Sequence, residues 1–90
     1  MLWVGEQRIT SMAASTTLTV PGTSDGRADC AMVIAEDQAV RIRRDGTAPT
    51  AAVGFRLPTD TPIWLFDDLS NVKVIEETAS ASFFVMYYRR

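Results

Sequence analysis

The chain has 90 residues, of which 47% are hydrophobic, and its formal net charge at pH 7 is −2. A single domain of this length buries only about 60–65% of its unfolded surface, so an apolar excess favours association with other proteins. The acidic balance argues against nucleic acid as a partner, and no apolar run approaches the roughly 20 residues of a membrane helix.

The first segment, Met1–Met12, is predicted to form an N-terminal arm ahead of a single β domain over residues 13–90. It contains the apolar cluster Leu2, Trp3 and Val4. Such a cluster near a chain end is usually held against the domain or against a neighbour. We therefore expect Leu2 and Trp3 to contribute to an interface.

Short segments with alternating side chains follow, and turn residues separate them. Successive side chains of a strand point to opposite faces, so this alternation marks strands. Their spacing, about 8–12 residues, and the lack of a 3.6-residue period predict an all-β fold, an antiparallel β-sandwich or jelly-roll-like barrel of about six to eight short strands. The expected strands are Ser15–Val20, Ala28–Ala35, Val40–Arg43, Ala52–Leu57, Ile63–Phe66, Val72–Glu76 and Ser82–Tyr88. A polar loop is expected at Thr23–Arg27.

The clearest local signal is a hairpin over Gln38–Leu57. Its turn is marked by Asp45 and Gly46, because glycine accepts a positive φ angle and aspartate tolerates one. Pro49 lacks a backbone N–H and follows shortly afterwards. We therefore expect a loop of more than two residues, at about Arg44–Thr50.

Arginines gather on the polar face of this hairpin. Arg41 and Arg43 lie on one strand, Arg44 follows them directly, and Arg56 lies on the other strand. Two interpretations remain open: the guanidinium groups bind carboxylates of a partner protein, since arginine is enriched at interfaces, or they form a charged outer face that protects a sheet edge.

Two predicted strands carry apolar side chains on both faces. Their outward residues are Trp64 and Phe66 in one strand and Phe84, Met86 and Tyr88 in the other. A two-layer sandwich has one inner face, so we expect the second apolar face to meet another subunit. The alternative is a sugar-stacking platform formed by Trp3, Trp64 or Tyr88.

No catalytic or metal site is predicted. The chain has no histidine, the commonest general base and metal ligand. Cys30 is the only cysteine and alternates with apolar neighbours, which is typical of a buried thiol. Adjacent carboxylates are expected to be solvated turn residues. We therefore expect no enzymatic activity, no metal and no cofactor.

Four stretches together form a recognisable pattern. They are TTLTVPG at Thr16–Gly22, QAVRIRRDGTAPTAAVG at Gln38–Gly54, the region Leu57–Ala79 with its TPIWLF segment, and VMYY at Val85–Tyr88. This pattern resembles that of small β-sandwich structural proteins in the virions of tailed bacteriophages. The resemblance implies a virion structural protein, assembled in the host cytoplasm, and it brings no catalytic residues with it.

The resemblance further implies a capsid decoration or cement subunit, or a protein near the head–tail junction. With the apolar excess, we expect a homo-oligomer, with a trimer preferred, bound to the major capsid protein or to another virion protein. Nucleic acid and membrane are not expected partners. The alternative function is a carbohydrate- or receptor-binding β module of a tail or head fibre.

Overall fold

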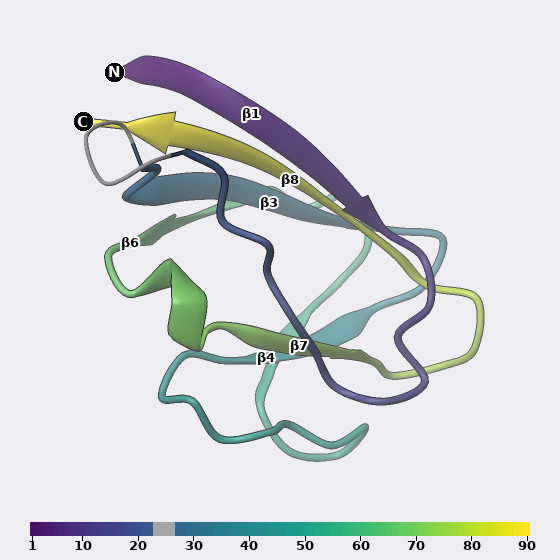
Figure 1. Cartoon of the computed structure of the whole chain (residues 1–90). Coiled ribbons are helices and arrows are strands. Elements are labelled where there is room, and N and C mark those ends of the chain that lie inside the picture. The colour runs from purple at the N-terminus through teal and green to yellow at the C-terminus, as the bar shows by residue number, and fades with distance from the viewer. Residues whose placement is uncertain (23–26) are drawn as a thin grey trace.

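The computed structural model describes residues 1–22 and 27–90 and contains two antiparallel four-stranded sheets (Figure 1). Of the loop expected at Thr23–Arg27, only Arg27 lies within the described residues. The elements that these residues form are β1 (Leu2–Ile9), β2 (Thr16–Thr17), β3 (Cys30–Glu36), β4 (Val40–Arg43), β5 (Phe55–Leu57), β6 (Ile63–Phe66), the 3-10 helix η1 (Leu69–Asn71), β7 (Lys73–Glu76) and β8 (Ser82–Arg89). None of the described residues forms a helix long and apolar enough to cross a membrane.

The strands pair like one long hairpin that has been rolled up. β1 pairs with β8, β2 with β7, β3 with β6, and β4 with β5, all antiparallel. Two further pairs, β3–β8 and β4–β7, produce sheet A with the order β1-β8-β3-β6 and sheet B with the order β2-β7-β4-β5. Nested pairing over two four-stranded sheets is the arrangement of a jelly roll. The predicted all-β sandwich is therefore confirmed.

The core lies between the two sheets, and β8 shows how the alternation builds it. Phe83, Val85 and Tyr87 are fully buried, while the residues between them point to the other face of sheet A. The Tyr87 hydroxyl donates a hydrogen bond to Gln7 Oε1 at 2.7 Å, and the same oxygen accepts the backbone N–H of Thr19 at 3.1 Å. Burial raises the pKa of the Tyr87 phenol. The hydroxyl is thus a satisfied donor within the core.

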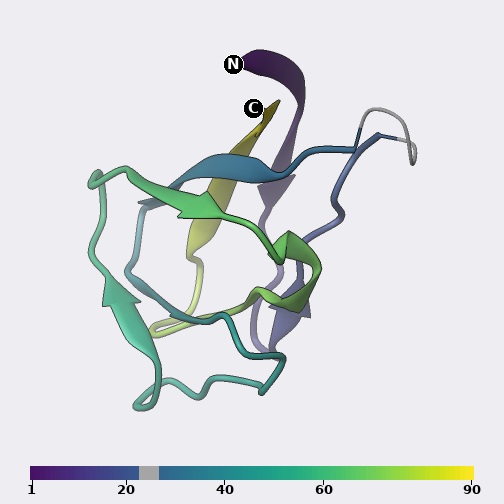
Figure 2. The ribbon, with the colours of Figure 1, turned by 90° about the vertical axis from the view of Figure 1, so that its left-hand side faces the viewer.

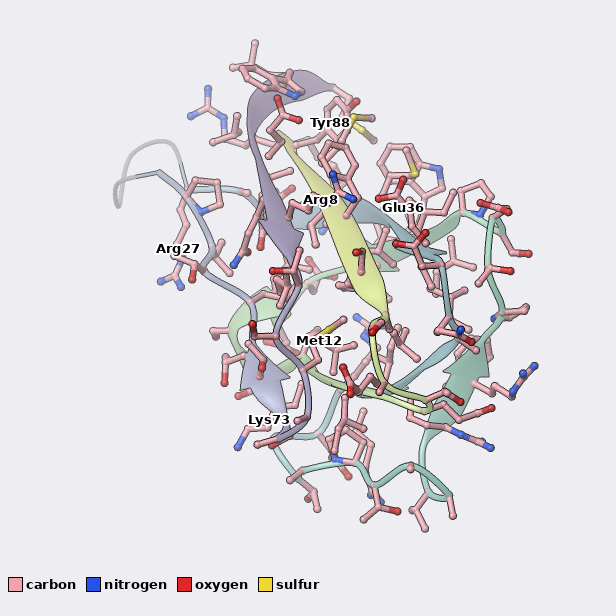
Figure 3. The ribbon with its side chains drawn as sticks, turned by 90° about the vertical axis from the view of Figure 1, so that its right-hand side faces the viewer. Arg8, Met12, Arg27, Glu36, Lys73 and Tyr88 are labelled. Carbon is pink, nitrogen blue, oxygen red and sulfur yellow. The ribbon has the colours of Figure 1, made fainter. Side chains whose placement is uncertain are left out.

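The N-terminal segment is part of the sandwich and differs from the expected arm. Its residues form β1, which pairs with β8 along its whole length and provides one edge of sheet A. Met12, at the expected boundary, is fully buried (Figure 3). The register shifts between Trp3 and Gly5. Such a bulge interrupts the period of two, which is why the sequence pattern did not reveal this strand.

The strand expected at Ser15–Val20 is shorter than predicted, since only β2 pairs with β7. The N–H of Thr19 is bound by the side chain of Gln7, so the ladder does not continue through it. Leu18 nevertheless points inward, as predicted, and is 5% exposed.

The predicted hairpin is confirmed by the pairing of β4 with β5, in which Val40 lies opposite Leu57. Gly46 has the expected positive φ angle, +81°. The connection spans residues 44–54 and is longer than expected, because Thr50 and Val53 bond to each other in a second turn with N–O distances of 3.0 and 3.2 Å.

We predict that Gly54→Ala lowers the free energy of unfolding by about 1–2 kcal/mol. Gly54 has a φ angle of +129°, and an added Cβ would lie 3.1 Å from the Ile42 carbonyl oxygen. Gly46→Ala is the matched control, since its φ angle is also positive but its nearest neighbour, Asn71 Oδ1, is 3.8 Å away. Urea denaturation followed by circular dichroism measures both. Equal losses would contradict the steric argument.

Candidate interaction surface

The outer face of sheet A carries an apolar surface that sheet B leaves uncovered. Residues that lie directly opposite one another in antiparallel strands point to the same side. Tyr88, Cys30 and Phe66 form one such row, and Met86, Met32 and Trp64 form the next. The surface that we call the apolar face consists of Met32, Ile34, Trp64, Phe66, Phe84, Met86 and Tyr88.

This apolar face is open in the single chain. Trp64 is 45% exposed and Phe66 is 42% exposed, and the remaining members are half-buried. The structure therefore brings together all five apolar residues that were predicted for β6 and β8. Met32 and Ile34 were missed as members, although they share one side of β3 with Cys30, a signal that was present in the sequence.

Aromatic rings meet across β3 at the centre of the apolar face. The Trp64 ring centroid lies 5.4 Å from that of Tyr88, tilted by 48°, and 6.1 Å from that of Phe66, nearly stacked. The side chain between them is Cys30, which is small and fully buried, as predicted. Burial, and then the adjacent Asp29, raise the pKa of this thiol. The thiol is thus a packing group beneath an aromatic cluster.

Charged groups border the apolar face near the C-terminal end of β8. The Arg90 guanidinium lies 5.5 Å from the centroid of the Phe66 ring and forms ion pairs with Asp67 and, at 3.6 Å, with Asp29. The backbone N–H of Arg90 donates to Asp29 Oδ1 at 3.0 Å and lowers the pKa of that carboxyl. The face thus has an apolar centre and a charged rim, as protein interfaces do.

Leu2 and Trp3 lie on the other edge of sheet A from Trp64. They are 56% and 55% exposed, and Trp3 lies opposite Tyr88, on the outer side of the sheet. We call Leu2 and Trp3 the knob. Both chain ends lie at the same end of the molecule, so the knob stands beside the C-terminus (Figures 1 and 2).

Three of the predicted arginines, Arg41, Arg43 and Arg56, lie on the outer face of sheet B, away from the apolar face, whereas Arg44 donates to the main-chain oxygens of Phe66 and Asp67. Arg41 and Arg56 are opposite each other in β4 and β5. Glu77 Oε2 lies 3.0 Å from Arg41 Nε and 2.9 Å from Arg56 Nε. Arg43 pairs with Asp45 at 2.7 Å. These three cations are therefore held by carboxylates of their own chain, and Glu77 is a residue that the sequence analysis missed.

We predict that Arg43→Gln raises the pKa of Asp45 towards its ordinary value. Hydrogen bonds from the Arg43 guanidinium and from the Thr47 N–H lower this pKa to about 2. Because the folded pKa is depressed, the stabilisation is present above pH 4 or so and is lost as the pH falls towards 2. A side-chain NMR titration measures the shift. The pKa of Asp29, lowered by Arg90, is the control and should not change.

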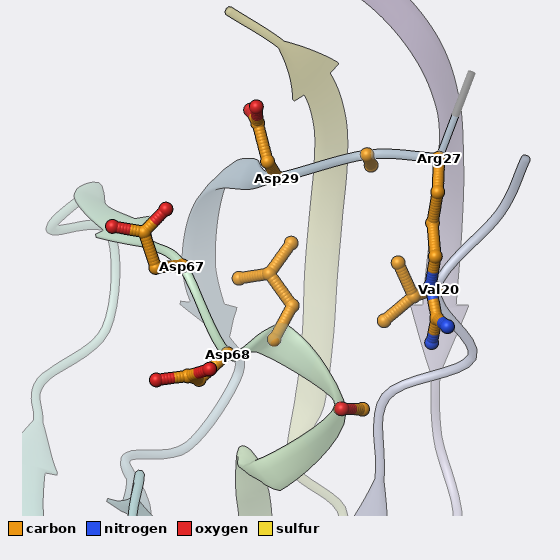
Figure 4. A pocket seen from close by; sticks show the side chains of 8 residues that line it. Val20, Arg27, Asp29, Asp67 and Asp68 are labelled. Carbon is orange, nitrogen blue, oxygen red and sulfur yellow. The ribbon is translucent and has the colours of Figure 1, made fainter. Parts of the chain in front are cut away.

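A polar pocket of about 300 Å³ lies beside the charged rim and is lined by Val20, Arg27, Asp29, Asp67 and Asp68, among others (Figure 4). Two of these carboxylates, Asp29 and Asp67, already bind Arg90. In the part of the chain that the structure describes, no group of three or more His, Cys, Asp or Glu side chains is placed to hold a metal ion.

No family model, curated protein or solved structure matches this chain. Its function is therefore inferred from the chemistry of its own surfaces and from the motifs quoted above.

Proposed function

We propose that this protein is a structural subunit of a bacteriophage virion, a capsid decoration or cement protein that acts by adhesion. The observation that carries the proposal is the apolar face of sheet A, with Trp64 and Phe66 more than 40% exposed. The sequence motifs that resemble those of phage structural proteins supply the biological setting. The apolar face binds sister subunits, and the knob and the arginines reach a neighbour or the capsid.

The composition of the apolar face supports adhesion. Trp, Tyr and Arg are the residues that most often dominate binding energy. Trp64 lies next to Tyr88 here, and Arg90 lies over Phe66, the stacking partner of Trp64. The face is built on paired strands, so little conformational entropy is lost when a partner covers it. Repetition of such a contact over a shell converts modest affinity into high avidity.

The outer face of sheet B supports a second, polar contact with the capsid. Arg43 lies opposite Lys73 in β4 and β7, and Arg41 lies opposite Ile75 two residues along, on the same side of the sheet. Four cations, Arg41, Arg43, Arg56 and Lys73, thus lie close to two carboxylates, those of Glu77 and Asp45. A partner with exposed carboxylates complements this excess of positive charge.

We predict that the wild-type chain is a homo-oligomer and that Trp64→Ala weakens its association by about tenfold or more. Val53→Ala is the matched control, since Val53 is 50% exposed but lies outside the apolar face. Size-exclusion chromatography with light scattering over a dilution series measures both variants. A wild-type chain that stays monomeric at high concentration would refute the proposed self-association.

The alternative function, carbohydrate or receptor binding, is favoured by one observation. Trp64 is an exposed aromatic platform, and the polar groups of Arg90 and Asp67 lie beside its stacking partner Phe66. Such a combination suits a sugar ring, which stacks on an aromatic face and hydrogen-bonds at its edge. A glycan array distinguishes the two functions. If the wild-type chain is monomeric and binds a glycan, and if Trp64→Ala abolishes that binding, carbohydrate binding replaces adhesion as the proposed function.

A further inference from the structure

Large exposed apolar side chains gather at two opposite edges of sheet A. The knob, Leu2 and Trp3, lies on β1 at one edge. Trp64 lies on β6 at the other edge, and Phe55, which is 60% exposed, lies on β5 at the corresponding edge of sheet B. Two strands separate β1 from β6, so the edges are about 14 Å apart and the knob cannot reach the far edge of its own chain.

The second of these edges contains an apolar pocket, which we call the side pocket. It has a volume of about 270 Å³ and is lined by Ile42, Arg44, Phe55, Ile63, Trp64 and Leu65. β5 and β6 flank this side of the roll in Figure 2, where the two sheets do not pair with each other. Ile42 and Leu65 are 2% and 4% exposed, so the pocket reaches into the core. A cavity of roughly 150 Å³ is enough for benzene, so this one accommodates an indole.

Charges on the two edges are complementary. Glu6 lies on the same outer side of β1 as Trp3 and is exposed, and within the described residues it has no ion pair. Arg44 lines the side pocket and donates to the main-chain oxygens of Phe66 and Asp67. Among residues 1–22 and 27–90 no carboxylate pairs with it either. Arg8 lies on the same outer side of β1 but pairs with Glu36 at 4.0 Å, which leaves Glu6 to meet Arg44 of a second copy.

The strand directions allow the two edges to join. Every neighbouring pair in sheet A is antiparallel, so β1 and β6 run in opposite directions. Rotation of a second copy about an axis along the strands brings its β1 beside β6 of the first copy, again antiparallel. Contacts between two different patches of identical chains form rings when the rotation closes.

We infer that the knob of one copy occupies the side pocket of the next, with Glu6 near Arg44, in a closed ring. This inference rests on the proposed self-association and specifies its geometry. Trp3, on the outer side of β1, packs against Trp64 of the neighbouring copy. Leu2, which lies opposite Arg89 on the inner side, faces Phe55 in the side pocket, and the Arg44 guanidinium stands at the edge of the pocket. The contact is head-to-tail, so each copy provides one knob and one pocket.

Mixing two complementary variants tests this geometry. Trp3→Ala removes the knob and keeps the pocket, whereas Phe55→Glu blocks the pocket and keeps the knob. Both positions are more than half exposed, so both variants are expected to fold. Each alone should be monomeric by light scattering. Their equimolar mixture should form a 1:1 complex and nothing larger, because one intact knob meets one intact pocket.

Other outcomes overturn the inference in distinguishable ways. If both variants are monomeric and their mixture stays monomeric, the contact joins the same patch on both copies, and the head-to-tail geometry is wrong while self-association stands. Variants that keep the wild-type oligomer also refute it. A monomeric wild-type chain refutes both the inference and the self-association.

A charge swap gives a second readout that does not depend on the knob. Glu6→Arg and Arg44→Glu should each weaken the wild-type oligomer by several-fold, because each places like charges together. The chain with both substitutions should recover most of the affinity. If the double variant has the wild-type circular dichroism spectrum but its affinity does not recover, Glu6 does not contact Arg44. The proposed register would then be wrong.

Discussion

Phe83→Ala is expected to lower the free energy of unfolding by about 3–5 kcal/mol, the range for removal of a fully buried aromatic ring. Phe83 is 0% exposed and lies between Ile9 and Ala35, its partners in β1 and β3. A domain of this size has a total stability of only about 5–15 kcal/mol. The variant should therefore lose a large share of its stability, which urea denaturation followed by tryptophan fluorescence will measure.

Phe84→Ala is the matched control for this loss. Phe84 is the next residue of β8 and points to the apolar face, where it is half-buried. In dilute monomer its replacement should cost far less stability than that of Phe83, while the association of the chain should weaken. The reverse result, a stable Phe83→Ala chain and an unfolded Phe84→Ala chain, would show that the two faces of sheet A have been assigned the wrong way round.

Glu77→Ala is expected to be the most destabilising change outside the core, with a loss of about 2–3 kcal/mol. Arg41 Nε is a buried atom and has no hydrogen-bond partner among the described residues, so the ion pair with Glu77 at 3.0 Å is its compensation. The Arg41 and Glu77 side chains are 22% and 23% exposed, which places the loss below the 3–5 kcal/mol of a fully buried pair.

Asp45→Asn is the control, since it breaks an ion pair whose side chains are 32% and 55% exposed. Pairs so accessible to water contribute about 0–1 kcal/mol, so this variant should stay close to the wild type. A second test replaces both partners of the buried pair. Arg41→Met together with Glu77→Ala should be more stable than Glu77→Ala alone, because no unpaired cation remains. If the single variant matches Asp45→Asn, Glu77 does not hold Arg41 in place.

The two outer faces of the sandwich have different chemistry, which gives the subunit a direction. Sheet A presents aromatic and aliphatic side chains, and sheet B presents arginines and Lys73. A subunit with this asymmetry can bind its own copies through one sheet and a carboxylate-rich protein through the other. The proposed ring uses the edges of sheet A together with the β5 edge of sheet B, and leaves Arg41, Arg43 and Lys73 on the outer face of sheet B outside the contact.

Local patterns predicted the elements whose alternation is unbroken. The pairing of β4 with β5 and the inward and outward sides of β8 follow from residues near in sequence. β1 was missed because its bulge breaks the period of two, and most of the strand expected at Ser15–Val20 was lost because a side chain, Gln7, takes the place of a paired strand. In both cases a contact with a distant residue decided the local structure.

The sequence by itself determined that this chain forms short antiparallel strands and carries more apolar surface than one interior can hide, because alternation and composition are properties of neighbouring residues. Only the tertiary structure decided which of these residues meet. Trp64 touches Tyr88 across β3, Glu77 holds Arg41 and Arg56, and the knob and the side pocket lie on opposite sides of the sandwich. The physical reason is that the rolled pairing joins strands from the two ends of the chain, and no local pattern encodes such partners.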